Sequence, residues 1–175
     1  RRFLASHEVL QRKASGKTKN WRGRNPACIL KLMAFFYIDG SLKVGTPDRH
    51  LDVEALARSA EGPAYIYDLD SVERRLLTLQ DALNGLAHSI HFAMKANSHP
   101  EILRCLHKLG AGVDTVSGGE IRKAVAAGIP PEHIVFSGVA KTRSEIEYAL
   151  QLGIKQLNIE SPQELDRIGT IAAQT

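Results

Sequence analysis

Cysteine is scarce in this chain of 175 residues, and so are long apolar runs. The two cysteines, Cys28 and Cys105, form no closely spaced pair, so the sequence indicates neither a disulfide framework nor a cysteine zinc site. A reducing cytoplasm is therefore the expected compartment. No apolar run approaches the length needed to cross a bilayer, and no association with a membrane is expected. His91, His99 and His107 recur at regular intervals but fall on different expected elements, so we predict no metal site.

Acidic residues are nearly missing from the first 32 positions. Residues 1–32 hold nine Lys or Arg and one acid, whereas residues 33–175 hold fourteen Lys or Arg and eighteen acids. The positive net charge of the chain therefore comes from residues 1–32. We call this segment the leader and do not expect it to join the fold. It is interpreted, in order of preference, as translated upstream sequence before Met33, an organellar targeting segment, or a nucleic-acid-binding arm. Trp21 alone is thin support for the arm, and no nucleic-acid partner is expected.

The rest of the chain has the composition and pattern of a soluble α/β domain. The sequence is 43% hydrophobic and 24% charged, as is usual for a globular protein. Runs typical of β-strands occur at residues 89–95, 112–116, 133–136 and 156–159, and a helical pattern separates each from the next. This spacing predicts successive βα units.

Helix start and stop signals support these units. Residues 142–145 and 161–164 match the capping pattern in which a hydroxyl caps the helix and a glutamate three residues later reaches back, and residues 70–73 match it weakly with an aspartate. Gly110, Gly128 and Gly153 stand where a residue in the left-handed conformation would end a helix.

Parallel strands joined by single helices form either an open doubly wound sheet or a closed barrel, and local pattern does not choose between them. In both, the functional edge lies where strands end and helices begin. The positions to inspect at this edge are Lys95, residues 117–119, residues 137–138 and residues 160–161.

Lys95 stands at the end of the first of these runs, just before a turn. A strand period of two places it on one face with His91 and Ala93, and the small Ala93 leaves room beside the amine. The position suits amine chemistry. The alternative is a lysine that extends from a strand end into solvent.

Two further features of the same edge are polar. Asp114 lies inside an otherwise apolar strand and needs a partner, for which Lys95 on the neighbouring strand is the obvious cation; otherwise Asp114 faces solvent at a frayed strand. Residues 116–120, Val-Ser-Gly-Gly-Glu, offer backbone amides at a helix N-terminus that could bind an anion such as phosphate. An ordinary tight turn explains the same residues equally well.

Four separated motifs carry a resemblance to a known family. They are HFAMKAN around Lys95, GAGVDTVSGGE at residues 110–120, IVFSGVAKT at residues 134–142 and LNIES at residues 157–161. Together they resemble the N-terminal half of the barrel of the fold type III pyridoxal-phosphate-dependent decarboxylases, most closely the members that act on diaminopimelate. Residues 35–40 and 62–68 also resemble the family's opening segment, so the resemblance extends from about Met33 to the end.

The resemblance implies the fold and the site. The expected fold is α/β: the N-terminal half of a (β/α)8 TIM-like barrel of the alanine racemase type, at residues 69–175, preceded by a segment of the β domain and a linker at residues 33–68. Lys95 is expected to hold pyridoxal 5'-phosphate as an internal aldimine, which requires a partly deprotonated amine and is favoured by burial. Asp114, Asn97 and Ser117 are expected beside the cofactor. Lys141 is interpreted as a solvated residue at a helix start.

The resemblance also implies what the sequence lacks. Such a barrel has eight strands, and about four follow from Lys95 onward. No stretch matches the family's glycine-rich phosphate loop, the acidic partner of the pyridine nitrogen, or the C-terminal β domain that helps to bind substrate and form the dimer. We therefore expect a fragment of a homodimeric enzyme, with little or no turnover by itself.

The implied activity is the decarboxylation of meso-2,6-diaminopimelate to L-lysine, a step of lysine biosynthesis. Decarboxylases of ornithine, arginine or carboxynorspermidine share the lysine chemistry and stay open as alternatives. So does a non-catalytic barrel fragment that binds pyridoxal phosphate or a partner subunit. Alanine racemase is disfavoured, since residues 98–100, Ser-His-Pro, do not resemble the sequence that follows its lysine.

Overall fold

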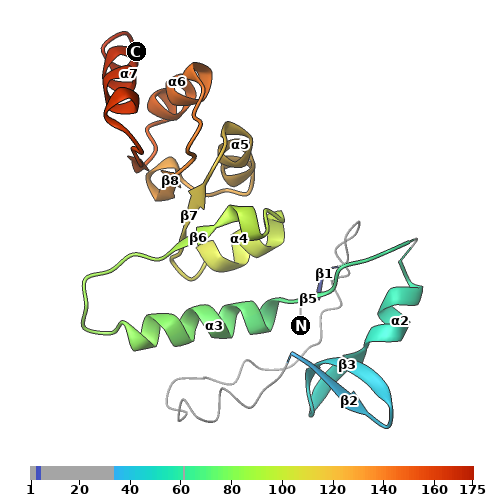
Figure 1. Cartoon of the computed structure of the whole chain (residues 1–175). Helices are drawn as coiled ribbons and strands as arrows, with labels where there is room; N and C mark the ends of the chain where they lie inside the picture. Colours follow the sequence, from blue (N-terminus) through green and yellow to red (C-terminus); the bar gives the residue numbers. More distant parts are fainter. Residues whose placement is uncertain (1–2, 5–33, 61) are drawn as a thin grey trace. The chain divides into compact units, whose positions relative to one another are not determined.

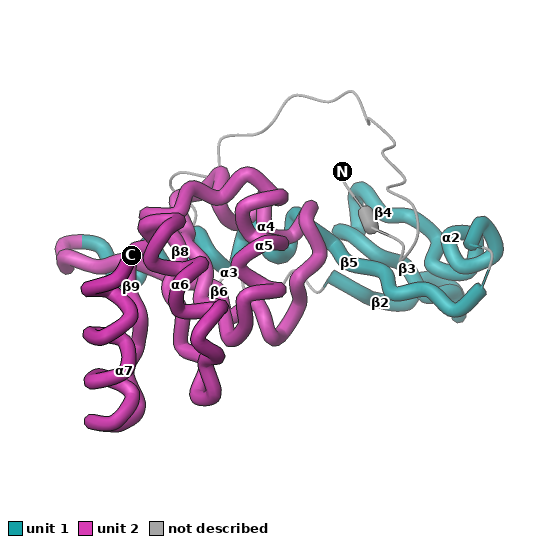
Figure 2. Tube along the Cα trace, turned by 90° about the horizontal axis from the view of Figure 1, so that it is seen from above, with its two compact units in different colours: residues 1–84 teal, residues 85–175 magenta. Residues whose placement is uncertain are grey.

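The computed structural model describes residues 3–4, 34–60 and 62–175. The chain separates into two compact units, residues 1–84 and residues 85–175, which are coloured separately in Figure 2. The interpretations of the basic leader, including those of Trp21 and Cys28, lie outside the described residues. Cys105 is buried, at 1% exposed.

The first unit is built mainly from antiparallel strands. A three-stranded sheet has the order β2-β3-β4, and α2 follows β4 directly. The turn between β2 and β3 has positive φ at Asp39 and Gly40, as a two-residue hairpin of matching twist requires. The elements are β1 (Phe3–Leu4), β2 (Phe35–Ile38), β3 (Ser41–Thr46), β4 (Arg49–Asp52), α2 (Val53–Arg58), β5 (Tyr67–Asp68), which pairs with β1, and α3 (Leu69–Ala82).

The second unit is a run of βα units, as the sequence predicts. Its four strands form one parallel sheet in chain order, β6-β7-β8-β9, and a helix follows each strand (Figure 1). The elements are β6 (His91–Ala93), η1 (Met94–Ala96), α4 (Pro100–His107), β7 (Gly112–Thr115), α5 (Gly118–Ala126), η2 (Pro131–His133), β8 (Ile134–Phe136), α6 (Arg143–Leu152), β9 (Gln156–Leu157) and α7 (Pro162–Ala172).

The register of this sheet aligns one residue from each strand in a row. Ala93 pairs with Asp114, Asp114 with Val135, and Val135 with Gln156. Because side chains alternate between the two faces of a strand, this row shares one face of the sheet. Asp114 thus lies in the row between a small and an apolar neighbour.

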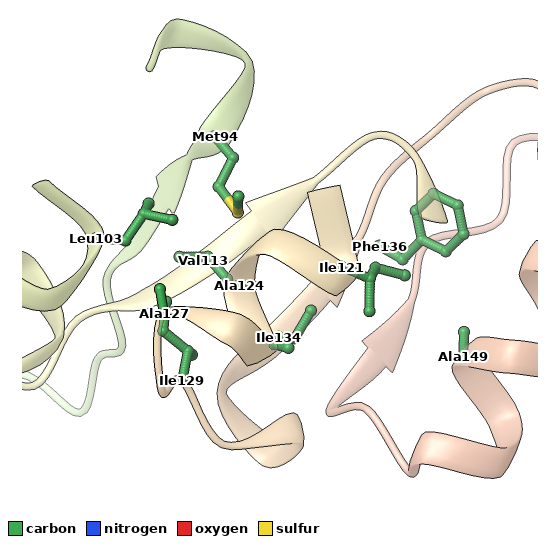
Figure 3. Close-up of a cluster of buried hydrophobic side chains, with 10 residues drawn as sticks. All are labelled: Met94, Leu103, Val113, Ile121, Ala124, Ala127, Ile129, Ile134, Phe136 and Ala149. Atoms are coloured by element: carbon green, nitrogen blue, oxygen red, sulfur yellow. The ribbon is translucent and has the colours of Figure 1, made fainter. Parts of the chain in front are cut away.

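The opposite face of the sheet carries the core. Val113, Ile134 and Phe136 are each at most 2% exposed and pack against helix residues such as Ile121 and Ala149 (Figure 3). Transfer of such side chains from water to a packed interior is the main stabilising contribution to this layer of helices and sheet. The helices therefore cover one face, and the row that contains Asp114 lies on the other.

The predicted helix signals are mostly confirmed. Thr142 and Glu145 form a reciprocal capping box at the start of α6, and the Ser161 hydroxyl caps α7. Gly110, Gly128 and Gly153 all have positive φ. The weak signal at residues 70–73 was wrong, since α3 begins at Leu69, with the preceding residue in the cap position.

No helix within the described ranges is both long enough and apolar enough to cross a membrane.

Gly112 and Gly169 should respond in opposite ways to the same substitution. A Cβ at Gly112 would lie 2.5 Å from the His133 carbonyl oxygen, whereas one at Gly169, inside α7, would meet nothing within 4 Å. We expect Gly112→Ala to lower the free energy of unfolding by about 1–3 kcal/mol through overpacking. Gly169→Ala should raise it by about 0.5–1 kcal/mol because alanine favours the helix. Urea denaturation followed by circular dichroism measures both, and a stabilising Gly112→Ala would contradict the register of β7 against β8.

Candidate functional site

Lys95 lies in the short 3-10 turn η1, just beyond the end of β6. The predicted strand, residues 89–95, was two residues too long at each end, and at its carboxyl end the backbone leaves the extended conformation after Ala93. Met94 is 1% exposed and joins the core, which anchors the turn, while Lys95 is exposed. Within the described part of the chain its amine has no hydrogen-bond or ion-pair partner. The described residues therefore leave the amine accessible but do not supply the expected burial.

Asp114 has a different partner from the one that the sequence suggested. Its Oδ1 accepts a hydrogen bond from the hydroxyl of Ser137, which directly follows β8. The expected pairing with Lys95 was therefore wrong. Among the described residues the second carboxylate oxygen, Oδ2, has no hydrogen-bond partner. One oxygen is thus held, and the other stays available to a ligand.

The Ser137 hydroxyl belongs to a longer chain of side-chain hydrogen bonds. Asn158, directly after β9, donates from Nδ2 to Ser137 Oγ at 2.8 Å. Gln156, at the start of β9, donates from Nε2 to Asn158 Oδ1 at 2.5 Å. We call the four residues Gln156, Asn158, Ser137 and Asp114 the polar relay. It crosses three adjacent strands along the carboxyl edge of the sheet.

Asn97 and Ser117 shape the ends of the loops at this edge. Asn97 accepts a hydrogen bond from the backbone N–H of His99 at 2.9 Å, which fixes the turn into α4. Ser117 is the N-cap of α5 and accepts from the backbone N–H of Glu120. Their contact with a cofactor stays a prediction.

The backbone amides at the start of α5 are already used by protein groups. Glu120 Oε2 accepts from the N–H of Val116, and Glu145 Oε1, from the next helix, accepts from the N–H of Gly118, each at 2.8 Å. Two carboxylates at this N-terminus oppose the binding of another anion. Of the two interpretations of residues 116–120, the structure supports the tight turn and not the phosphate site.

Glutamates also join neighbouring βα units. Glu145 bonds both Thr142 N, at the start of its own helix, and Gly118 N, at the start of α5. Glu164 in α7 bonds Glu160 N and the Lys141 ammonium, which precedes α6. Each therefore fixes the loop before its own helix against a loop of the preceding unit.

Lys141 is buried, so its interpretation as a solvated residue was wrong. Its side chain is 0% exposed, and its Nζ donates to Glu164 Oε1 at 2.9 Å and to the Asn158 carbonyl oxygen at 2.6 Å. The ammonium also lies 5.4 Å from the centroid of the Phe136 ring. Lys141 thus connects the loop after β8 to the loop after β9, next to the polar relay.

Sequence analysis did not assign roles to Ser137 and Asn158. Ser137 was noted only as a polar residue at the edge, and Asn158 only as part of a motif. A usable signal exists, because each directly follows a strand and equivalent positions of parallel strands meet at one edge. Among the described residues, no group of three or more His, Cys, Asp or Glu could hold a metal ion.

The described fold and edge define a class of protein. Residues 69–175 match the family model of the pyridoxal-dependent decarboxylases, pyridoxal binding domain, and the chain belongs to this family. Its four parallel βα units correspond to the N-terminal half of the TIM-like barrel of that fold.

Diaminopimelate decarboxylases are among the chain's relatives. The enzyme of Pseudomonas aeruginosa is 44% identical over 69% of the chain and 30% of its own length, and that of Helicobacter pylori is 48% identical over 68% of the chain and 29% of its own length. The chain therefore spans about 30% of the length of these curated relatives.

Solved structures agree with this assignment. Diaminopimelate decarboxylase from Helicobacter pylori in complex with L-lysine has a TM-score of 0.66 and 46% identity, covering 69% of this chain and 31% of that one. Ornithine decarboxylase from Entamoeba histolytica is more distant, with a TM-score of 0.56 and 29% identity over 61% of this chain and 32% of that one.

The charge of Glu145 and Glu164 should make stability depend on pH. Hydrogen bonds from Gly118 N and Thr142 N lower the pKa of Glu145 below its ordinary 4.5, and bonds from Glu160 N and Lys141 lower the pKa of Glu164 in the same way. Because the folded pKa is the lower one, this stabilisation is complete above the unfolded value and is lost as the pH falls through the folded value. We expect Glu145→Gln with Glu164→Gln to flatten the loss of stability below about pH 4.5. Urea midpoints between pH 7 and pH 3 test this.

The matched control for that experiment is Glu147→Gln, in the exposed Arg143–Glu147 pair of the same helix. Exposed pairs contribute little, so its acid profile should follow the wild type. An unchanged acid profile in the double glutamine variant would show that these carboxylates do not join the βα units.

Removal of the Lys141 ammonium should be costly because it leaves buried acceptors unpaired. We expect Lys141→Met to lower the free energy of unfolding by about 3 kcal/mol. Glu164→Gln should lower the free energy of unfolding less in the Lys141→Met variant than in the wild type, because the two side chains are partners. Denaturation of the four proteins gives the coupling energy, and strict additivity would argue against the ion pair.

Proposed function

We propose that this chain supplies the lysine-bearing part of a pyridoxal 5'-phosphate-dependent decarboxylase that converts meso-2,6-diaminopimelate to L-lysine. The observation that carries the proposal is the exposed amine of Lys95, which has no partner among the described residues. It lies at the carboxyl edge of a parallel sheet, one strand away from the held carboxylate of Asp114.

The residues at the edge fit part of the cofactor. An accessible lysine can condense with the aldehyde of pyridoxal phosphate, and the free oxygen of Asp114 can accept from a cationic nitrogen nearby. At the start of α5 the amides of Val116, Gly118 and Glu120 already donate to protein oxygens, and two of these acceptors are carboxylates, which disfavours a phosphate there. The phosphate is therefore expected to bind elsewhere in the enzyme.

The chemistry divides between cofactor and protein. When bound, pyridoxal phosphate supplies an aldehyde and a ring that accepts the electrons left by the departing carboxylate. Lys95 would hold the cofactor through its amine. Asp114 provides negative charge beside the reacting nitrogen, and Asn97 and Ser117 keep the flanking loops in place.

The choice of substrate rests on similarity. Identity to the diaminopimelate decarboxylases of Pseudomonas aeruginosa and Helicobacter pylori, 44% and 48%, exceeds the 29% to the ornithine decarboxylase of Entamoeba histolytica, which favours diaminopimelate over the smaller diamino acid. We extend the proposal to a homodimeric enzyme in the cytoplasm, as the family resemblance implies.

Borohydride trapping tests the role of Lys95. Incubation of the chain with pyridoxal 5'-phosphate should produce a visible absorption band, and reduction followed by peptide mass spectrometry should place the label on Lys95. We expect Lys95→Arg, which keeps the charge but not a condensing amine, to lose at least about 90% of the label.

The matched control is Lys108→Arg, since Lys108 lies at the far end of α4 from this edge. It should label like the wild type. A label spread over surface lysines, or centred on another position, would falsify the assignment. Release of carbon dioxide from ornithine but not from diaminopimelate by the enzyme containing this chain would overturn the substrate.

A further inference from the structure

Asp114, at the end of the polar relay, determines the donor-to-acceptor direction of its hydrogen bonds. A carboxylate only accepts hydrogen bonds, so the Ser137 hydroxyl must donate to Asp114. Ser137 then uses a lone pair to accept from the Asn158 amide nitrogen, which turns the Asn158 amide oxygen toward the donor of Gln156. All three bonds therefore run toward Asp114. Aligned bonds of this kind polarise and strengthen one another.

The side chains of Ser137 and Asn158 are not needed to set the register of the sheet. The backbone N–H of Ser137 bonds to the Thr115 carbonyl at 2.8 Å, and that of Asn158 bonds to the Phe136 carbonyl at 2.9 Å. These bonds continue the parallel ladder past the strand ends. Asp114 is a partly buried carboxylate between Ala93 and Val135 in the row, which is costly in free energy, and an apolar residue would avoid that cost.

Lys95 and two residues of the polar relay, Ser137 and Asn158, follow their strands at equivalent positions. Lys95, Ser137 and Asn158 each lie two residues beyond the aligned row that contains Ala93, Asp114, Val135 and Gln156. Asp114 is therefore flanked by β6, which leads to Lys95, and by β8, which leads to Ser137. The hydrogen bond from Ser137 holds Oδ1 from the β8 side, and Oδ2 has no hydrogen-bond partner among the described residues.

We propose that Ser137 and Asn158 are positioning residues that orient Asp114 toward a protonated nitrogen at the Lys95–cofactor link. This inference rests on the proposed function. Ser137 fixes the rotation of the carboxylate, and Asn158 fixes the rotation of the Ser137 hydroxyl. Both act through Asp114.

The connection itself can be tested without any cofactor. In nitrogen-edited NMR spectra of the full 175-residue chain, we expect Asp114→Asn to move the side-chain amide signals of Asn158, which it does not contact. Ser137→Ala should move them as well and should abolish their response to Asp114→Asn. Ser144→Ala removes an exposed hydroxyl at the start of α6 and should leave them in place. Asn158 signals that ignore both Asp114→Asn and Ser137→Ala overturn the relay.

The effect on the site is measured by titrating the absorption of the chain labelled with pyridoxal 5'-phosphate. A neighbouring carboxylate favours the protonated form of a nitrogen, so Asp114→Asn should move the titration midpoint down by about 1 pH unit or more. Ser137→Ala should lower the midpoint by about half as much, since this substitution keeps the charge of Asp114 but no longer fixes the orientation of its carboxylate. Ser137→Thr keeps the hydroxyl and should restore the midpoint. Thermal unfolding confirms that each variant is folded.

Coupling between the variants distinguishes a relay from independent effects. Once Ser137 is alanine, Asn158→Ala should cause no further change in the midpoint, although it lowers the midpoint by itself. Additive shifts, or a midpoint unaffected by Ser137→Ala in a labelled protein, overturn the positioning role. Wild-type protein that forms no Lys95 adduct would instead overturn the proposed function, and the NMR comparison would still decide whether the relay exists.

Discussion

Glutamates that cap helices and also reach a neighbouring loop are the constraint on which the carboxyl edge of the parallel sheet depends. Each satisfies donors that a helix N-terminus leaves unpaired, and each does so across two βα units. Glu145 joins the starts of α5 and α6, and Glu164 joins the start of α7 to the loop before α6. The loops that carry the site are therefore held to one another as well as to their own strands.

This use of the helix N-termini decides what the edge can bind. Backbone amides that already donate to carboxylates of the protein are not available to a phosphate. The start of α5 therefore does not favour the phosphate site that its glycine-rich sequence suggested. Among the described residues, the Lys95 amine is exposed and Asp114 Oδ2 has no hydrogen-bond partner, and these two groups suit an aldehyde and a cationic nitrogen. The edge therefore fits the reactive end of pyridoxal phosphate better than its phosphate.

Local features of the sequence could be predicted because they depend on neighbours in the chain. The capping box at Thr142 and the left-handed glycines, such as Gly153, follow from backbone sterics within a few residues. The end of β6 could not be predicted as well, because the run continues to Lys95 with no breaking residue. The burial of Met94 in the core turns the backbone there, and that packing is not a local property.

The sequence by itself determined the order of strands and helices, the family, and the lysine at the end of the first parallel strand. Only the tertiary structure decided that Asp114 pairs with Ser137, that Lys141 is buried against Glu164, and that Asn158 takes part in the relay. The physical reason is that these partners lie about twenty residues apart and meet only through the register of parallel strands. The direction of each side chain then depends on which donors and acceptors its neighbours have left unpaired.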